Sequence, residues 1–235
     1  PVQETVVSNQ PLLTAAGIKK SFSIEGCRID VLRGADIAVV RGEMVAIVGA
    51  SGVGKSTLMQ VLGALDAPDF GNVKFKGVDV FALNEEARAE IRNASLGYVF
   101  QFHHLLAEFT AAENVAMPMF IAGYEQKIAI EKANLILADL GLSKRVEHRP
   151  AQLSGGEQQR VAVARSLVMD PELVLADEPT GNLDRRNSES LLQVFRDLHE
   201  RRGLTSVLVT HSSAVASVCD RVLYMTDGVL EKKTD

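Results

Sequence analysis

The stretch MVAIVGASGVGKST, residues 44–57, constrains the fold of the chain more than any other. Its apolar run breaks into a glycine-rich loop with the pattern GxxxxGK followed by Ser or Thr, and a helical pattern follows at KSTLMQVLGAL. A strand, such a loop and a helix in succession open a parallel α/β unit whose main-chain N–H groups cradle phosphate. The helix N-terminus adds positive potential at the same point. We therefore predict a phosphate site in which Lys55 reaches the outer phosphates and Ser56 binds Mg²⁺. The predicted loop comprises Gly49, Ala50, Ser51, Gly52, Val53, Gly54, Lys55, Ser56 and Thr57.

A second apolar run, LVLADEP at residues 173–179, ends in an acidic pair. Beside a phosphate loop, Asp177 is placed to hold Mg²⁺ through water, and Glu178 to activate the attacking water. His211 follows the run TSVLVT, at the end of a strand where open parallel sheets gather their ligands. Taken alone, the acidic pair is typical of a solvated turn and the histidine of a structural residue. Together with the phosphate loop they predict a nucleotide site with Lys55, Glu178 and His211 as catalytic residues.

Composition narrows the class of protein. The chain has 46% hydrophobic and 23% charged residues, which is typical of a globular domain. Its formal net charge of −5 lacks the basic bias of nucleic-acid-binding proteins, so we expect no nucleic-acid partner. No apolar run approaches the roughly 18 residues of a membrane helix, and the N-terminus lacks the pattern of a signal peptide. We therefore expect a cytosolic protein whose Cys27 and Cys219 are reduced thiols.

The succession of strand and helix patterns predicts one domain over residues 11–235, preceded by a flexible tail at residues 1–10. Short alternating stretches within residues 12–40, separated by Gly26 and Gly34, indicate antiparallel strands. The chain is long enough to add a parallel α/β core to this antiparallel piece.

A helical block interrupts the strand-rich core. Strand signals occur at residues 96–100, 173–176, 205–209 and 221–225, and later helical signals at residues 187–201 and 212–218. Between them, residues from about 102 to 168 form a predicted helical subdomain. Two capping-box spacings mark helix starts in this block, Thr110 with Glu113 and Ser154 with Glu157.

The run FQFHHLL, residues 100–106, sets two histidines inside apolar sequence. It is open to three interpretations: a metal or acid-base site, a piece of core, or a surface for another protein. Adjacent histidines are poor partners in one metal site, because on a strand they face opposite ways and on a helix they diverge by about 100°. The residues alone favour a structural role over a catalytic one.

The run LSGGEQQR, residues 153–160, stands between the phosphate loop and LADEP and resembles the signature motif of ATP-binding-cassette (ABC) ATPases. GNLD at residues 181–184 is similar to the D-loop of that family, THS at 210–212 to its switch-histidine segment, and Gln101 to the glutamine of its Q-loop. The resemblance implies a P-loop NTPase fold: a RecA-like α/β core with an antiparallel β subdomain and an inserted α-helical subdomain. It covers the chain from about Leu12 to Leu230.

The resemblance also implies the ligands and the assembly. In the family, two subunits face each other head to tail, and each ATP lies between one phosphate loop and the partner's signature motif. This implies ATP and Mg²⁺ as cofactors and a second copy of the chain as a partner. Gln101 would join Ser56 and Asp177 at the Mg²⁺. The remaining implied ATP contacts are Phe22, which would stack on adenine, Ser154, Gly155, Gly156 and Asp184. A core phenylalanine is the competing interpretation of Phe22, and Ser212 stands where the family more often has aspartate.

Within the family, the run QFHHLLAEFTAAENVAMPMFIAG, residues 101–123, is most similar to ATPase subunits of lipoprotein-releasing transporters. This implies a peripheral protein on the cytoplasmic face of the bacterial inner membrane, attached through two integral permease subunits similar to LolC and LolE. Its task would be to drive the release of lipid-modified proteins toward a periplasmic carrier. His103, His104 and Leu105 are the residues expected to couple the ATPase to these partners.

Related ATPases remain as alternatives, namely those of macrolide-type exporters and of the cell-division complex. An ATPase of DNA repair or translation usually needs a long coiled-coil insertion or a second cassette, and the sequence contains neither. A nucleotide-binding module without turnover is predicted to lack the acidic residue that Glu178 provides.

Overall fold

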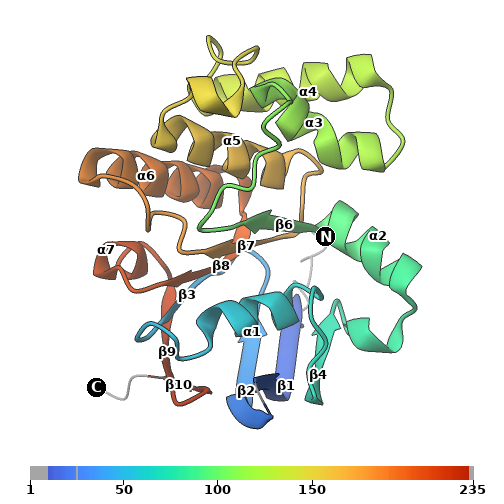
Figure 1. Cartoon of the computed structure of the whole chain (residues 1–235), viewed down its shortest axis with the longest axis vertical. Helices are drawn as coiled ribbons and strands as arrows, with labels where there is room; N and C mark the ends of the chain where they lie inside the picture. The colour runs from blue at the N-terminus through green and yellow to red at the C-terminus, as the bar shows by residue number, and fades with distance from the viewer. Residues whose placement is uncertain (1–9, 25, 233–235) are drawn as a thin grey trace, which may run out of the picture.

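The computed structural model describes residues 10–24 and 26–232. Two sheets and two groups of helices are arranged in layers (Figure 1). The predicted tail, residues 1–10, lies outside the described residues except for Gln10. Among the described residues, no helix combines the length and the apolar character that crossing a bilayer requires.

The larger sheet has six strands in the order β10-β9-β3-β8-β7-β6. Strands β9, β3, β8, β7 and β6 run parallel, and β10 pairs antiparallel with β9 at one edge. The bounds are Met44–Val48 for β3, Leu96–Val99 for β6, Leu173–Asp177 for β7, Thr205–Thr210 for β8, Arg221–Thr226 for β9 and Val229–Lys232 for β10. These strands confirm the predicted parallel α/β core.

The smaller sheet is antiparallel, with the order β2-β1-β4-β5. Its strands are β1 at Leu13–Ile24, β2 at Cys27–Val39, β4 at Phe70–Phe75 and β5 at Val78–Asp79. Gly26 lies in the turn between β1 and β2 as predicted, whereas the prediction that Gly34 separates two strands is wrong. Gly34 lies inside β2 with φ of 127°, opposite a register shift between Ile18 and Lys19. A bulge at this glycine bends the strand without ending it.

The helices are α1 at Lys55–Leu62, α2 at Glu85–Ser95, α3 at Ala111–Ile121, α4 at Gln126–Asp139, α5 at Gly155–Leu167, α6 at Arg185–Arg202 and α7 at Ser213–Ala216. Short 3₁₀ turns occur at Val80–Ala82 and Pro150–Gln152. Both predicted capping boxes are present, Thr110 with Glu113 at the start of α3 and Ser154 with Glu157 at the start of α5.

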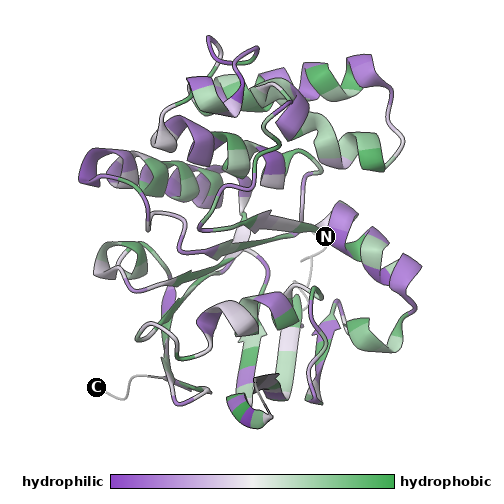
Figure 2. Ribbon diagram, in the orientation of Figure 1, coloured by the Kyte–Doolittle hydropathy of each residue, from purple (hydrophilic) through white to green (hydrophobic). Residues whose placement is uncertain are grey.

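The parallel sheet separates two hydrophobic cores. Along β7, Leu173 and Leu175 pack with α1 and the antiparallel sheet, while Val174 and Ala176 pack with α3, α4, α5 and α6. This is the period of two that a strand buried on both faces requires. In Figure 2 the hydrophobic colour follows the strands of the larger sheet, and hydrophilic residues line the outer side of α6.

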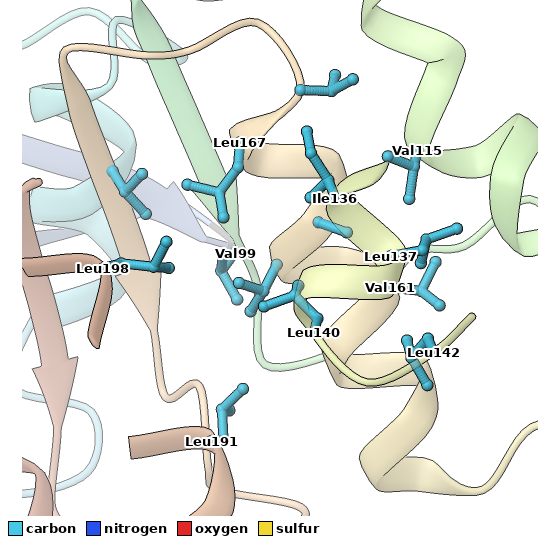
Figure 3. Packing of buried hydrophobic residues seen from close by; sticks show 14 of the residues in the cluster. Val99, Val115, Ile136, Leu137, Leu140, Leu142, Val161, Leu167, Leu191 and Leu198 are labelled. Atoms are coloured by element: carbon cyan, nitrogen blue, oxygen red, sulfur yellow. The ribbon is translucent and has the colours of Figure 1, made fainter. Parts of the chain in front are cut away.

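The helical core is built from side chains of α3, α4 and α5, such as Val115, Leu137 and Val161 (Figure 3). All three have 0% exposure. Burying a side chain of this kind contributes about 2 kcal/mol. The helical block is therefore held to the sheet by its own apolar face, and it places the N-terminus of α5 away from that of α1 (Figure 1).

Candidate nucleotide site

Four loops meet at the carboxyl edge of the parallel sheet. β3 pairs in parallel with β8, β8 with β7, and β7 with β6, so the segments that follow these strands leave the sheet on the same side. Ligands of open parallel sheets bind at this edge. A cleft of about 640 Å³ lies there, lined by Phe22, Val31, Ser51, Gly52, Gly54, Lys55, Ser56, Thr57, Gln101, Asp177, Glu178 and His211. The fold thus brings together residues from six separate segments.

The phosphate loop depends on its glycines. A Cβ at Gly49 would lie 2.5 Å from the main-chain oxygen of Met225, so only glycine fits against β9. Gly52 and Gly54 have φ of 78° and 107°, a backbone region that glycine adopts without strain. Gly54 caps α1 without a side-chain hydrogen bond, and the first turn of α1 carries no acidic residue. The first N–H groups of α1 therefore face the cleft as donors for an anion.

Lys55 is the buried cation of the cleft. Its side chain is 7% exposed, and Nζ donates to the main-chain oxygens of Gly49 and Ala50 at 3.0 and 2.9 Å. These two carbonyls of the phosphate loop hold the Lys55 ammonium group close to the loop itself. Because Nζ has three protons, it retains one for a ligand oxygen.

Asp177 ends β7 beside Ser56. Its Oδ1 is buried without a hydrogen-bond partner. Burial raises the pKa of the Asp177 carboxyl; the Ser56 hydroxyl opposes this shift, the Glu178 carboxylate adds to it, and Lys55 opposes it. An unpaired buried carboxylate oxygen beside a hydroxyl fits a cation with oxygen ligands such as Mg²⁺. Within the described residues no group of three His, Cys, Asp or Glu side chains gathers, so phosphate and water would complete such a shell.

Glu178 is fixed by both its backbone and its carboxylate. Its φ of 45° is unusual for a residue with a side chain, and its N–H donates to the oxygen of Val209 at 2.8 Å. Oε2 accepts a hydrogen bond from the Thr210 hydroxyl at 3.1 Å, and Oε1 lies 2.8 Å from Nδ1 of His211. Its side chain is 12% exposed, against 67% for His211. The arrangement presents a carboxylate to the cleft with a histidine at its open side.

Several predicted residues do not line this cleft. Gly49, Ala50 and Val53 belong to the phosphate loop but do not line the cleft. Ser154, Gly155 and Gly156 lie at the N-terminus of α5, and Asp184 caps α6 by accepting hydrogen bonds from the main chain and side chain of Asn187. A Cβ at Gly156 would lie 2.6 Å from Oδ1 of that asparagine. The signature motif and the D-loop therefore form a second polar surface on the chain, separate from the cleft.

The Ser154 hydroxyl has a partner within its own helix cap. Its Oγ donates to Oε2 of Glu157 at 2.9 Å and accepts from the Glu157 N–H at 3.3 Å. Arg145 lies 2.7 Å from the same carboxylate. The Arg145 guanidinium, joined by the hydrogen bonds from Ser154, lowers the pKa of Glu157 to about 2. The Ser154 hydroxyl is therefore engaged within the cap of α5, and its predicted contact with ATP stays a prediction.

Phe22 and Gln101 both line the cleft. Phe22 is 39% exposed, and the Lys20 ammonium lies 5.5 Å from its ring centre. Phe22 is therefore not a core residue, and its stacking on adenine stays a prediction. Gln101 follows β6 and reaches toward Gly181, where a Cβ would lie 3.5 Å from its Nε2.

Of the three residues predicted to couple the chain to its partners, His103, His104 and Leu105, only His104 is exposed. His104 is exposed with φ of 47°, whereas His103 is half-buried and its Nε2 is buried without a partner. Burial lowers the pKa of His103, and His104 and Arg165 add to this shift. Leu105 packs against the helical core. The exposed apolar side chains here are those of the two flanking residues, Phe102 and Leu106, at 66% and 43%.

Sequence reasoning missed the residues that fix these loops. Asn114 has 0% exposure and bonds the main chain of Leu106, Phe109 and Thr110. Thr210 orients Glu178, and Val31 of β2 lies against Gly54. The asparagine in ENVAMP is a polar residue inside an apolar helical pattern, and that contrast was the one available signal. The hydrogen bond from Thr210 to the Glu178 carboxylate and the approach of Val31 to Gly54 have no signal in the sequence.

Comparisons with known proteins agree with this geometry. A family model described as ABC transporter matches residues 32–181. The lipoprotein-releasing system ATP-binding protein LolD of Geobacter metallireducens is 50% identical over 92% of the chain and 96% of its own length. The protein of the same name from Bacteroides thetaiotaomicron is 49% identical over 94% of the chain and 100% of its own length.

Solved structures give the same picture. The dimeric structure of MJ0796, described as a bacterial ABC transporter cassette, has a TM-score of 0.87 and 36% identity, and the match covers 94% of this chain and 97% of that one. A dimeric post-hydrolysis state of MJ0796 bound to ADP and Pi gives a TM-score of 0.87 at 35% identity, with the same coverage.

Proposed function

Because the chain belongs to the ABC transporter family of ATPases, we propose that it is the subunit that drives an inner-membrane transporter to release lipoproteins toward a periplasmic carrier. The chain binds nucleotide and hydrolyses ATP. The observation that carries the catalytic part of the proposal is the single cleft that contains the phosphate loop, Asp177, Glu178 and His211. The cargo rests on near full-length similarity to relatives named as lipoprotein-releasing ATP-binding proteins.

In the proposed reaction, the first N–H groups of α1 and Lys55 hold the outer phosphates of ATP. Ser56, Gln101 and Asp177 would hold Mg²⁺, Asp177 through water, and the bound ion would offset the charge on the phosphate oxygens. Glu178 accepts a proton from the attacking water, and its carboxylate is oriented for this by the Thr210 hydroxyl.

His211 completes the proposed catalytic group from the open side of the cleft. With its proton on Nδ1 it donates to Glu178 at 2.8 Å, and this leaves Nε2 available to contact the γ-phosphate or the water. Its 67% exposure means that a second surface must cover it before water is excluded from the reaction.

A second copy of the chain supplies that cover in our proposal. Ser154, Gly155 and Gly156 at the start of α5 do not line the cleft of their own chain, and Asp184 lies beside them at the start of α6. In a head-to-tail dimer the N-terminus of α5 from one subunit would meet the γ-phosphate held by the other, since a helix N-terminus attracts anions. ATP then joins the two subunits, and loss of phosphate releases them.

The membrane attachment that we propose is indirect. The chain sits at the cytoplasmic face of the inner membrane through two integral permease subunits similar to LolC and LolE. His103, His104 and Leu105 lie just after Gln101 and couple the two sites, with Phe102 and Leu106 as the exposed apolar neighbours. ATP use suits the cargo, because each buried CH₂ of an acyl chain holds a lipoprotein in the bilayer by about 0.8 kcal/mol.

The catalytic assignment is tested by Glu178→Gln. The amide keeps the shape of the side chain but accepts no proton, so we expect ATP binding to persist, hydrolysis to fall by at least about 100-fold and the ATP-bound dimer to accumulate. Turnover, nucleotide affinity and dimer mass are measured together. Glu189→Gln, an exposed carboxylate on α6, is the matched control. Hydrolysis at the normal rate in the Glu178 variant would show that another group is the base.

The transporter is tested by purifying the chain with its partners from detergent-solubilised membranes. Two permease subunits with large periplasmic domains support lipoprotein release, whereas a cell-wall amidase regulator identifies the cell-division complex and a macrolide-type exporter identifies the other alternative. His104→Ala is expected to reduce this co-purification without changing ATP affinity. A large loss of ATP affinity instead would place the histidine in the nucleotide site.

A further inference from the structure

The segment from Phe100 to His104 is held through its main chain. It joins β6 to the helical block and has no regular structure of its own. The main-chain oxygen of Gln101 accepts a hydrogen bond from Nδ2 of Asn182 at 3.0 Å. The oxygens of His103 and His104 accept from the two terminal nitrogens of Arg165, each at 2.8 Å. Side chains from two distant parts of the sequence thus fix the backbone just at and just after Gln101.

Arg165 holds two consecutive peptide units with one guanidinium. It lies in the last turn of α5, the helix that begins at the signature motif. A planar guanidinium places two N–H donors in a fixed spacing, and an ammonium group cannot reproduce that geometry. His104 has φ of 47°, a conformation that costs roughly 1 kcal/mol or more for a residue with a side chain. The two bonds from Arg165 help to hold His104 in that conformation.

Contacts between aromatic rings also support the segment from Phe100 to His104. Phe100 stacks on Tyr98 with ring centres 6.0 Å apart, and the His104 ring meets the edge of Phe100 at 5.5 Å. The Tyr98 hydroxyl in turn donates to the main-chain oxygen of Gly63, at the end of α1. The segment is therefore continuous with the helix that begins at the phosphate loop.

Asn182 approaches Gln101 from the loop that follows Glu178. The loop turns back on itself, with the Gly181 N–H donating to the Glu178 oxygen at 3.0 Å. Gly181 lies against the Gln101 amide, and a Cβ there would be 3.5 Å from Nε2. Asn182 then closes the contact with its hydrogen bond to the Gln101 oxygen. The loop that carries Glu178 and the segment that carries Gln101 therefore share one fixed arrangement.

We propose that Arg165 and Asn182 are positioning residues that set where the Gln101 side chain lies in the nucleotide cleft. Neither lines the cleft, so neither touches ATP within its own chain. They act by fixing the carbonyl of Gln101 and those of His103 and His104 just after it, and this holds the backbone from which the Gln101 side chain extends. The inference rests on the role proposed above for Gln101 at Mg²⁺. It adds that α5 and the loop after β7 control that role through two side chains, Arg165 with two hydrogen bonds and Asn182 with one.

The test is a set of mutant cycles on the full-length chain. Asn182→Asp keeps the shape of the side chain and removes its donor, and Arg165→Lys keeps the charge and removes the paired donors. Each is made with Gln101 intact and with Gln101→Ala, and kcat, KM, the Mg²⁺ dependence of turnover and the ATP dissociation constant are measured. A misplaced contact at a reacting centre lowers kcat by about tenfold or more. We expect such a loss for both variants when Gln101 is present, with the ATP dissociation constant changed by less than about twofold.

When Gln101 is already alanine, each variant is expected to change kcat by less than about twofold, because the group that it positions is gone. Two controls have the same chemistry elsewhere. Asn93→Asp removes an amide donor to the oxygen of Pro118 at 3.2 Å, and Arg202→Lys alters the ion pair with Asp139. Both are expected to leave kcat unchanged.

Two outcomes separate the possible failures. If both variants lower kcat equally in the presence and absence of Gln101, or leave it unchanged when Gln101 is present, the positioning role is wrong. If Gln101→Ala alone leaves kcat and the Mg²⁺ dependence unchanged, the role proposed for Gln101 fails first, and the inference fails with it. Melting temperatures measured in parallel show whether any loss of kcat reflects loss of folded protein.

Discussion

Replacing Asn114 by alanine is expected to destabilise the chain far more than the loss of a small polar side chain suggests. Asn114 lies on α3 with 0% exposure. Its Oδ1 accepts from the Leu106 N–H at 2.7 Å, and its Nδ2 lies 3.1, 3.1 and 3.0 Å from the main-chain oxygens of Leu106, Phe109 and Thr110. One side chain thus holds the whole loop that leads from the FQFHHLL run into α3.

The magnitude follows from the groups left without partners. The Leu106 N–H loses its acceptor, which costs about 1–3 kcal/mol for a buried group. The oxygens of Leu106 and Phe109 lose a donor, at about 0.5 kcal/mol each if water reaches them. The oxygen of Thr110 keeps its helical bond to the Asn114 N–H at 2.9 Å. The sum predicts a loss of about 3 kcal/mol in the free energy of unfolding.

Urea unfolding followed by circular dichroism measures this loss. Asn93→Ala is the reference, because that half-buried asparagine makes one bond, to the oxygen of Pro118 at 3.2 Å, and should cost about 1 kcal/mol. Asn114→Asp should be still less stable at pH 7, since it places a carboxylate against main-chain oxygens, and should recover partly as the pH falls and the carboxyl is protonated. If Asn114→Ala costs no more than Asn93→Ala, the loop is held by other contacts and the reasoning is wrong.

Two further predictions concern the cleft and the signature helix. Gly49→Ala places a Cβ 2.5 Å from the Met225 oxygen and should weaken ATP binding by at least about tenfold in a fluorescent-nucleotide titration, while Gly155→Ala, whose Cβ would meet nothing within 4 Å, should leave binding to the isolated subunit unchanged. The pKa of Glu157 is lowered from 4.5 to about 2, so its ionised form stabilises the fold above about pH 4.5 and this contribution is lost as the pH falls toward 2. Melting temperatures of Glu157→Gln should therefore lack part of the acid decline seen in the unmodified chain, and identical slopes would contradict the assignment.

The parts of the molecule that the sequence predicts are those where residue type and spacing act together. The phosphate loop needs glycines and a lysine at fixed intervals, and its place between a buried strand and a helix is visible in the hydrophobic pattern. The two capping boxes were predicted for the same reason, because a hydroxyl and a carboxylate three residues apart satisfy N–H groups in a way that few other pairs do. The strand ends that carry Asp177 and His211 follow from the buried strands.

The sequence pattern between residues 66 and 95 predicted no strand or helix, although this region contains β4, β5 and α2. No residue of α2 is fully buried, and Ile91 is its one large apolar side chain, so the repeat that marks a helix packed on a core is carried mostly by alanines. β4 includes Gly71, whose Cβ would lie 2.5 Å from the oxygen of Ala16, and β5 spans only Val78–Asp79. β4 forms by pairing with β1, and β5 by pairing with β4, and such tertiary pairing has no local pattern in the sequence.

Three side chains that the sequence did not predict share a further property, which is that they bind main-chain oxygens. Asn114, Arg165 and Asn182 each donate to carbonyls in the segment that joins β6 to α3. Every residue has a carbonyl, so nothing in the identity of Gln101 or His103 indicates that a distant side chain will hold it. The donors themselves stand inside runs that are already explained by another role, such as GNLD and the helix after the signature motif. Substituting Gln101 or His103 therefore leaves these bonds intact and tests only the side chains, whereas changing the donors tests how the backbone is held.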